Sequence, residues 1–356
     1  MKDYDLIIIG AGLSGLTLAY FLRKRGIESL VLEGRSRAGG RIDTLTLPGG
    51  TLEMGATWIQ PQHRQIIDLA SELGLALIPQ YTGSKVVYDL PSGVEHYLLP
   101  PAAPTYRLEG GTARLIEALQ GQLPANCVRY DQKVEHMDFS EKKGVQIRTT
   151  SDQFGALKVI SSLPPNLLIN TLTTDPAWPS ALTEAARQTH TWMGESIKVG
   201  MEVAKAPWRE QEVGMLLSNR GPATELHDHG VTHGGHLLKG FIDPSHASLS
   251  PTERRERMLG QLQRLFPSLA DASINYHEKV WSQDPFTYYP YHSFVAPHQN
   301  NGAGIFRSDF YDGRLRLTGA ETAATSPGYM DGAVVRSAQL ATELSKETEA
   351  HGNLSP

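Results

Sequence analysis

Apolar runs and glycine-rich turns alternate at the start of the chain. Residues 5–9 read Asp-Leu-Ile-Ile-Ile, and their apolar positions, which do not alternate with polar ones, predict a buried parallel strand. Residues 10–15 read Gly-Ala-Gly-Leu-Ser-Gly and lead into apolar positions at helical spacing, which predict a helix that ends at Gly26. A second apolar run at residues 30–32 predicts the next strand. This order of strand, turn, helix and strand predicts an α/β fold.

The glycine turn predicts a dinucleotide-binding site. Gly10 permits a tight turn, Gly12 lets a pyrophosphate approach the backbone, and Gly15 lets the helix pack closely on the strand. Leu13 and Ser14 lie at the helix N-terminus, where free N–H groups and the positive end of the helix dipole attract phosphates.

Glu33 follows the second apolar run, 23 residues after Gly10. A carboxylate at this place accepts hydrogen bonds from both ribose hydroxyls of a dinucleotide and disfavours a 2′-phosphate. The strand, the helix and the acid together make the glycine motif much more specific than it is alone. We expect Gly34 and Arg35 to contact the same cofactor.

The following segment favours FAD over NAD. Residues 37–41 read Arg-Ala-Gly-Gly-Arg. Gly40 would form a second backbone turn, and Arg41 would bring a guanidinium beside the pyrophosphate. The sequence therefore predicts an FAD-binding domain.

The rest of the chain alternates between strand and helix patterns. We expect a helix that ends at residue 75, short strands with a proline-rich turn at 76–104, and a helix at 113–123. Further strands are expected at 128–137, 144–149, 158–163, 192–203 and 316–318, a helix at 252–266, a glycine-rich hairpin loop at 225–240 and a helix at the C-terminal end.

These motifs, together with two near the C-terminal end, resemble the flavin-containing amine oxidase family, which includes monoamine, polyamine and L-amino-acid oxidases. The late motifs are Trp-Ser-Gln-Asp-Pro-Phe at residues 281–286 and Gly-Ala-Glu-Thr at 319–322, followed by Ser-Pro-Gly-Tyr-Met at 326–330. The resemblance covers nearly the whole chain except residues 76–104 and 210–275.

The resemblance implies a composite fold, α/β together with α+β. A Rossmann-like FAD-binding domain of the GR2 type would be discontinuous in sequence and would comprise residues 1–75, 105–190 and 276–356. A mixed-sheet substrate domain would take residues 76–104 and 191–275. Full-length members carry a long helical insertion over the substrate cavity, and here it is reduced to residues 76–104.

The resemblance also assigns cofactor contacts outside the first motif. Residues 55–58 would run under the flavin ring, Val134 would bond adenine through its backbone, and the last helix would begin against the ring. The residues expected in these roles are Gly55, Ala56, Thr57, Trp58, Val134, Gly319, Glu321, Tyr329, Met330 and Ala333. Pro290 stands where some monoamine oxidases link the flavin to a cysteine, so we expect FAD to be bound without a covalent link.

Three residues carry the expected catalysis. Lys198 lies among apolar residues of a strand, where the family's lysine bonds a water at flavin N5, although strand alternation also allows it to face solvent on an edge. Tyr291 and Tyr329 would form an aromatic cage that orients the substrate nitrogen. The implied reaction oxidises an amine to an imine, which water converts to aldehyde and ammonia, while O2 becomes H2O2.

Other functions remain open at this stage. An L-amino-acid oxidase would need an arginine for the carboxylate, such as Arg64; a related desaturase or a non-catalytic FAD-binding protein shares the first motifs. Four histidines at 227–236 fit no zinc spacing, and we expect no metal.

Charge and hydropathy exclude some partners. The net charge is −5, and the longest apolar runs fall short of eighteen residues, so we expect neither nucleic acid nor a membrane as a partner. We expect a cytoplasmic protein and a possible homodimer.

Overall fold

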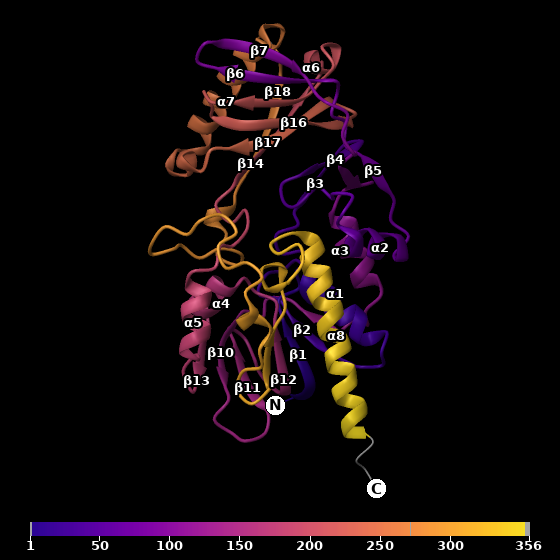
Figure 1. Ribbon diagram of the computed structural model, residues 1–356, viewed down its shortest axis with the longest axis vertical. Coiled ribbons are helices and arrows are strands. Elements are labelled where there is room, and N and C mark those ends of the chain that lie inside the picture. Colours follow the sequence, from indigo (N-terminus) through magenta and orange to yellow (C-terminus); the bar gives the residue numbers. More distant parts are fainter. Residues whose placement is uncertain (1, 271, 353–356) are drawn as a thin grey trace.

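The computed structural model describes residues 2–270 and 272–352, and these form two lobes stacked along the long axis (Figure 1). The lower lobe in this view contains the N-terminus and the long helix α8 (Met330–Gly352), and the upper lobe is built on a second sheet.

The lower lobe contains an eight-stranded sheet in the order β13-β10-β11-β12-β1-β2-β9, with β19 paired to β12. The centre of this sheet is parallel, because β1 pairs in the parallel direction with both β2 and β12. The strands are β1 (Lys2–Ile9), β2 (Leu30–Leu32), β9 (Val128–Arg129), β10 (Val134–Asp138), β11 (Val145–Thr149), β12 (Gln153–Ser161), β13 (Thr173–Asp175) and β19 (Leu315–Leu317).

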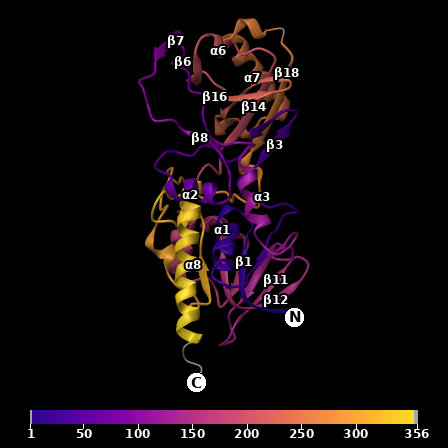
Figure 2. The same cartoon turned by 90° about the vertical axis from the view of Figure 1, so that its right-hand side faces the viewer.

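Both faces of β1 are buried, as its apolar run predicted. Leu6 and Ile8 join the apolar cluster of helices α1 and α8, whereas Ile7 and Ile9 join the cluster under β10 and β11 on the other face. Figures 1 and 2 show α1 and α8 lying against the same face of the sheet. The helices of this lobe are α1 (Leu13–Arg23), α2 (Arg64–Glu72), α3 (Ala113–Gly121), α4 (Pro165–Thr171), α5 (Ser180–Arg187) and α8.

The upper lobe contains a seven-stranded sheet in the order β18-β14-β17-β16-β15-β6-β7. Its strands are β6 (Lys85–Leu90), β7 (Gly93–Leu98), β14 (Ile197–Val203), β15 (Val213–Ser218), β16 (Ala223–Thr232), β17 (Gly235–Ile242) and β18 (Ile274–Val280). The helix α7 (Pro251–Leu265) begins at a capping box of Ser250 and Glu253 and packs its buried side chains on this sheet. The short helix α6 (Pro207–Glu210) contacts β15 of the same sheet.

Two small two-stranded sheets lie between the large ones: the hairpin of β3 (Thr44–Leu47) and β4 (Gly50–Glu53), and the pair of β5 (Leu77–Pro79) with β8 (Tyr106–Leu108). Residues 76–104 form β5, β6 and β7 without a helix, in agreement with the reduced insertion.

Three expectations from the sequence change. Residues 128–137 are two strands in different parts of the sheet, because Asp131 turns the chain with a positive φ. Residues 225–240 are mostly the long strands β16 and β17 and not a loop. The expected domain boundary at residues 275/276 falls inside β18, which pairs with β14 along its length, so we propose to move this boundary to residue 280.

Candidate active site

The glycine turn between β1 and α1 is closely packed on one side and open on the other. A Cβ at Gly15 would lie 2.0 Å from the carbonyl oxygen of Gly10, so the helix reaches the strand only because this residue is glycine. A Cβ at Gly12 would meet nothing closer than the Cα of Gly40, at 3.8 Å. The backbone of Gly12 therefore faces open space beside the second glycine turn.

The start of α1 is free to bind an anion. Its N-cap residue is Gly12, which has no side chain to cap the helix, and the first turn contains no acidic side chain. Leu13 and Ser14 line the neighbouring cavity. Unpaired N–H groups at the positive end of a helix suit a pyrophosphate, so this turn fits the expected dinucleotide.

The side chain of Glu33 is fixed beside this turn by backbone hydrogen bonds. Its carboxylate accepts hydrogen bonds from the backbone N–H groups of Ala11, at 2.7 Å, and Arg35, at 3.0 Å. Glu33 also lines a smaller cavity of about 80 Å³. Of the residues expected to contact the cofactor, Gly10, Gly12, Glu33, Gly34, Arg35 and Val134 line this smaller cavity.

The second glycine turn is tied to the far end of the chain. Arg41 donates a hydrogen bond of 2.9 Å to the carboxylate of Glu321, whose side chain is almost fully buried. The same guanidinium donates to the backbone carbonyl of Trp192 at 3.2 Å. The structure thus joins two residues that the sequence placed separately at the cofactor. Gly319, two residues before Glu321, lines neither cavity.

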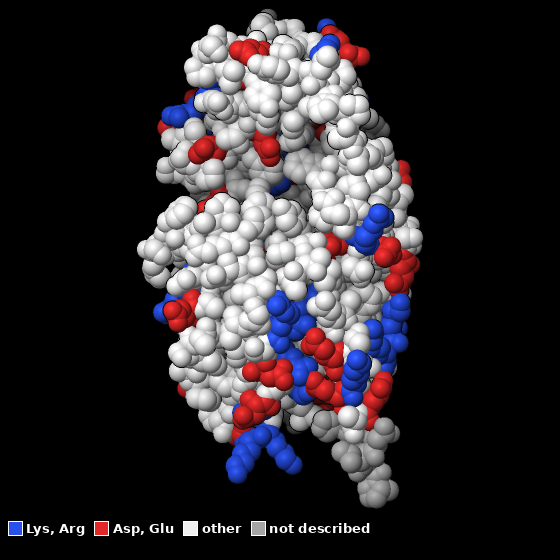
Figure 3. Space-filling model, in the orientation of Figure 1, with Lys and Arg blue, Asp and Glu red and all other residues white. Residues whose placement is uncertain are grey.

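The larger of the two cavities that Gly12 lines, about 440 Å³, lies where the two lobes meet, and Figure 3 shows the molecular surface hollowed between them. Its walls come from α1 and the start of α8 below and from β14, β16 and β17 above. The expected site residues that line it are Gly12, Leu13, Ser14, Arg41, Gly55, Ala56, Thr57, Trp58, Lys198, Tyr329, Met330 and Ala333.

Lys198 on β14 points into this cavity rather than to solvent. Its side chain is 5% exposed, and its ammonium lies 3.7 Å from the ring centre of Phe241 and 5.3 Å from that of Trp58. Burial, followed by the charge of Lys239, holds the pKa of Lys198 well below that of an ordinary lysine. The edge position that alternation allowed is excluded, because β17 and β18 pair with β14 on both sides.

Lys239 is a second buried lysine, which the sequence analysis did not select. It lies on β17, is fully buried, and donates a hydrogen bond to the hydroxyl of Thr57. Burial lowers the pKa of Lys239 to about 7, against the raising effect of the Glu53 charge. The signal was present in the sequence, since residues 237–242 are an apolar strand interrupted by one lysine, as in the strand of Lys198.

Acidic groups lie near the two lysines. Burial raises the pKa of Glu53, whose carboxylate accepts bonds from the Thr112 N–H at 2.6 Å and the Thr44 hydroxyl at 2.8 Å. Glu225 lines the cavity itself, and its hydrogen bond to His227 lowers the pKa of this carboxyl. Sequence reasoning missed Glu225 because it comes into the site through the pairing of β16 with β17.

The expected cage of two tyrosines is not formed. Tyr291 lines neither cavity, and its hydroxyl accepts from the Thr191 N–H at 2.6 Å and donates to the Thr189 carbonyl at 3.2 Å. Trp192 takes the place beside Tyr329, with ring centres 5.7 Å apart. These two hydrogen bonds of the Tyr291 hydroxyl explain the difference, because they hold the side chain against residues 189–191, outside the cavity.

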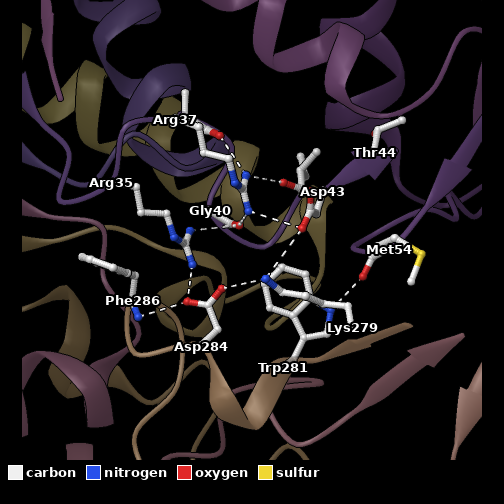
Figure 4. Close-up of polar contacts among 12 residues, drawn as sticks. Arg35, Arg37, Gly40, Asp43, Thr44, Met54, Lys279, Trp281, Asp284 and Phe286 are labelled. Atoms are coloured by element: carbon white, nitrogen blue, oxygen red, sulfur yellow. Dashed lines mark hydrogen bonds and ion pairs between the residues drawn. The ribbon is translucent and has the colours of Figure 1, made fainter. Parts of the chain in front are cut away.

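A charged network ties the second glycine turn to the end of β18 (Figure 4). Arg35 pairs with Asp284, and Lys279 lies 3.2 Å from the same carboxylate and 3.8 Å from that of Asp43. Beside it, Trp281 donates to the Met54 carbonyl at 2.8 Å and lines the larger cavity. The network therefore fixes the cavity wall relative to the cofactor turn.

Comparison with known families gives two matches. A family described as flavin containing amine oxidoreductase matches residues 93–344, and one described as NAD(P)-binding Rossmann-like domain matches residues 8–73. No helix in the part of the chain that the structure describes has the length and apolar character needed to cross a membrane.

Curated relatives align with only part of the chain. Putrescine oxidase of Kocuria rosea is 39% identical over 94 residues, which are 26% of this chain and 20% of that protein. The probable flavin-containing monoamine oxidase A of Dictyostelium discoideum is 32% identical over 109 residues, 30% of this chain and 24% of that protein. The chain thus matches well under half the length of these relatives.

Solved structures agree over nearly the whole chain. Cyclohexylamine oxidase from Brevibacterium oxydans has a TM-score of 0.84 at 20% identity, covering 98% of this chain and 100% of that one. Putrescine oxidase bound to putrescine has a TM-score of 0.81 at 20% identity, covering 96% and 99%. At these identities the likeness shows the fold, which is the expected α/β Rossmann-like domain with a mixed second sheet. Since the family match spans more than half of its residues, this chain belongs to the flavin containing amine oxidoreductase family.

Proposed function

We propose that this protein oxidises small amines to imines with FAD bound without a covalent link, and that O2 takes up the electrons as H2O2. The observation that carries the proposal is the position of Lys198 in a cavity that continues from the glycine turns of the dinucleotide site. The cofactor, when bound, would accept a hydride equivalent, that is, two electrons and a proton, from the substrate carbon next to nitrogen.

The residues of the two lobes have distinct roles in this proposal. Gly12, Leu13 and Ser14 would hold the pyrophosphate through backbone N–H groups, and Glu33 would hold the ribose. Arg41, fixed by Glu321, would add positive charge beside the pyrophosphate. Val134 stays the proposed backbone contact of adenine.

The upper sheet would bind the substrate. Lys198, Phe241 and Glu225 lie in one row across β14, β17 and β16, because Lys198 pairs with Phe241 and Phe241 pairs with Glu225. The rings of Phe241 and Trp58 would attract the substrate nitrogen. Tyr329 and Trp192 would close the cavity from the lower lobe, in place of the two-tyrosine cage.

The charges of the cavity favour amines over amino acids. Among the described residues, Arg41 is the arginine that lines the larger cavity, and it is already paired with Glu321. Arg64, the candidate for a carboxylate clamp, is exposed and lies outside the cavity. Glu225 would instead attract a second positive charge, and the solved putrescine oxidase was bound to putrescine, a diamine. Diamines are therefore the first substrates to test.

An anaerobic absorbance titration tests the proposal. Purified protein with its bound flavin is titrated with diamines, monoamines and L-amino acids, and H2O2 is then measured in air. We expect diamines or monoamines to bleach the flavin band and to give peroxide. Bleaching by amino acids alone would favour an amino-acid oxidase, and a yellow protein that no member of the panel bleaches would contradict the proposal. The cytoplasmic location and the homodimer stay predictions.

A further inference from the structure

Two lysines share one water-poor space behind the cavity. Lys198 and Lys239 come from the neighbouring strands β14 and β17, and their side-chain nitrogens lie close together over one ring, 5.3 and 4.5 Å from the centre of Trp58. Lys239 is fully buried and Lys198 is 5% exposed. Two ammonium groups at this distance and with this little water repel each other strongly, so the pair holds a single proton most easily.

The hydrogen bonds around Lys239 indicate where that proton lies. The hydroxyl of Thr57 donates to the Gly55 carbonyl at 3.1 Å, so its oxygen accepts the bond from Lys239. The Glu53 carboxylate stabilises a charge on Lys239, and the ring of Trp58 lies 4.5 Å from the Lys239 nitrogen. Lys198 is then the neutral member of the pair, and its single lone pair is free to accept a hydrogen bond from the cavity.

Other titratable groups lie around the pair, on four strands. They are Glu53 on β4, Arg107 on β8, Glu225, His227 and His229 on β16, and Lys279 on β18 opposite Lys198. Arg107 adds to the repulsion at Lys239, whereas Lys279 is paired with Asp284 and Asp43. Burial, with the charges of Lys239 and Arg107, keeps the pKa of His229 well below its usual value, so this ring is neutral at pH 7.

We propose that Lys239 is a positioning residue, which retains the proton of the lysine pair so that Lys198 presents a neutral amine to the cavity. A neutral Lys198 accepts a hydrogen bond from a water or from the nitrogen of a substrate and does not repel a cationic amine. The consequence for substrates rests on the proposed amine oxidation, whereas the state of Lys198 itself does not.

Cyanate labelling measures the state of Lys198 directly, because cyanate carbamylates only neutral amines. The flavin-loaded wild type and K239M are labelled across a pH series, and Lys198 modification is followed by peptide mass spectrometry relative to the exposed Lys142. We expect the midpoint for Lys198 in K239M to rise by about one pH unit or more. K205M, which removes an exposed lysine just after β14, should leave the Lys198 midpoint unchanged.

A second variant covers the case in which K239M does not fold. In K239R the neighbouring charge is permanent, and we expect the Lys198 midpoint to stay at or below that of the wild type. A midpoint in K239R that rises toward an ordinary lysine, or one in folded K239M that does not move, would overturn the inference.

Kinetics separates this inference from the proposed function. In K239M, Lys198 would take up the proton, so we expect the KM for a cationic amine at pH 7 to rise about tenfold with a smaller change in kcat. If no amine is oxidised at all, the proposed function fails but the labelling result still stands. If amines are oxidised and K239M changes neither KM nor the labelling midpoint, the role of Lys239 fails alone.

Discussion

At the scale of the residue, the cavity depends on polar groups buried among aromatic rings. Lys198 would be costly to bury alone, since desolvation disfavours its charged form. The row of Lys198, Phe241 and Glu225 places an amine, a ring face and a carboxylate side by side. Such a row offers a small cationic substrate three different contacts along one wall of the cavity.

Replacing Lys198 by methionine tests the first member of this row. Methionine keeps the length of the side chain but cannot accept a hydrogen bond, so we expect FAD to stay bound and kcat/KM for the best amine to fall about 100-fold. Anaerobic stopped-flow measurements of flavin reduction, followed by mixing with O2, show which half-reaction slows. K205M is the matched control, and unchanged rates in K198M would exclude Lys198 from both steps.

Replacing Glu225 by glutamine tests the carboxylate. Glutamine keeps the shape but removes the charge, so we expect KM for a diamine to rise about tenfold or more, because a hydrogen bond to a charged group is lost. A monoamine of the same chain length should change little. Steady-state peroxide assays on both substrates give the comparison, and equal effects on the two would argue against a second cationic contact.

At the scale of the element, the helix α1 reaches the sheet through a single missing side chain. Gly15 is inside the helix, where glycine is normally unfavourable, yet a Cβ there would overlap the Gly10 carbonyl. Glycine therefore lowers the intrinsic stability of the helix at this position but allows α1 to approach β1 closely. This approach places the free N–H groups of its first turn at the cofactor cavity.

G15A should displace α1 from the turn. We expect the free energy of unfolding to fall by about 1–3 kcal/mol, as for overpacked cores, together with weaker retention of FAD. G260A is the matched control, because Gly260 is also inside a helix, α7, but a Cβ there meets nothing within 4 Å. We expect G260A to stabilise by about 0.5–1 kcal/mol. Urea unfolding and flavin absorbance measure both, and a G15A variant as stable as the wild type would contradict the packing argument.

At the scale of the whole molecule, the cavity exists because two sheets are held at a fixed distance. The Asp284 carboxylate, 7% exposed, binds Arg35 from the lower lobe and Lys279 from the upper sheet (Figure 4). Burial alone would raise the pKa of Asp284, but the hydrogen bond and charge of Arg35, with Lys279, lower it on balance. The ion pairs thus connect the cofactor turn to the substrate wall.

D284N should loosen this connection. We expect a loss of about 3 kcal/mol at pH 7, because the buried Arg35 keeps its charge without a partner. The native carboxyl has the lowered pKa, so its stabilisation is complete above its unfolded value of about 3.9 and disappears as the pH falls through the native value. The difference between wild type and D284N should therefore shrink in acid. Unfolding curves at several pH values test this, with the exposed Asp312 in D312N as the control.

The sequence predicted the local elements of the lower lobe well. The apolar run of β1, the glycine turn and the spacing to Glu33 act between neighbouring residues, so their patterns can be read along the chain. The same holds for α7, whose capping box lies within four residues. The motifs of residues 281–286 and 319–322 indicated the family, although their contacts with residues 35–41 come only from folding.

The tertiary structure decided what the patterns could not. Strand alternation left the direction of Lys198 open, and only the pairing of β14 with β17 and β18 on both sides buries it. Tyr291 had the expected spacing, but backbone groups of residues 189 and 191 hold it outside the cavity. Lys239 and Glu225 enter the site through the register of distant strands. The sequence by itself determined the cofactor turn, because that turn is local, and the fold determined the substrate cavity, because its walls meet only when separate strands pair.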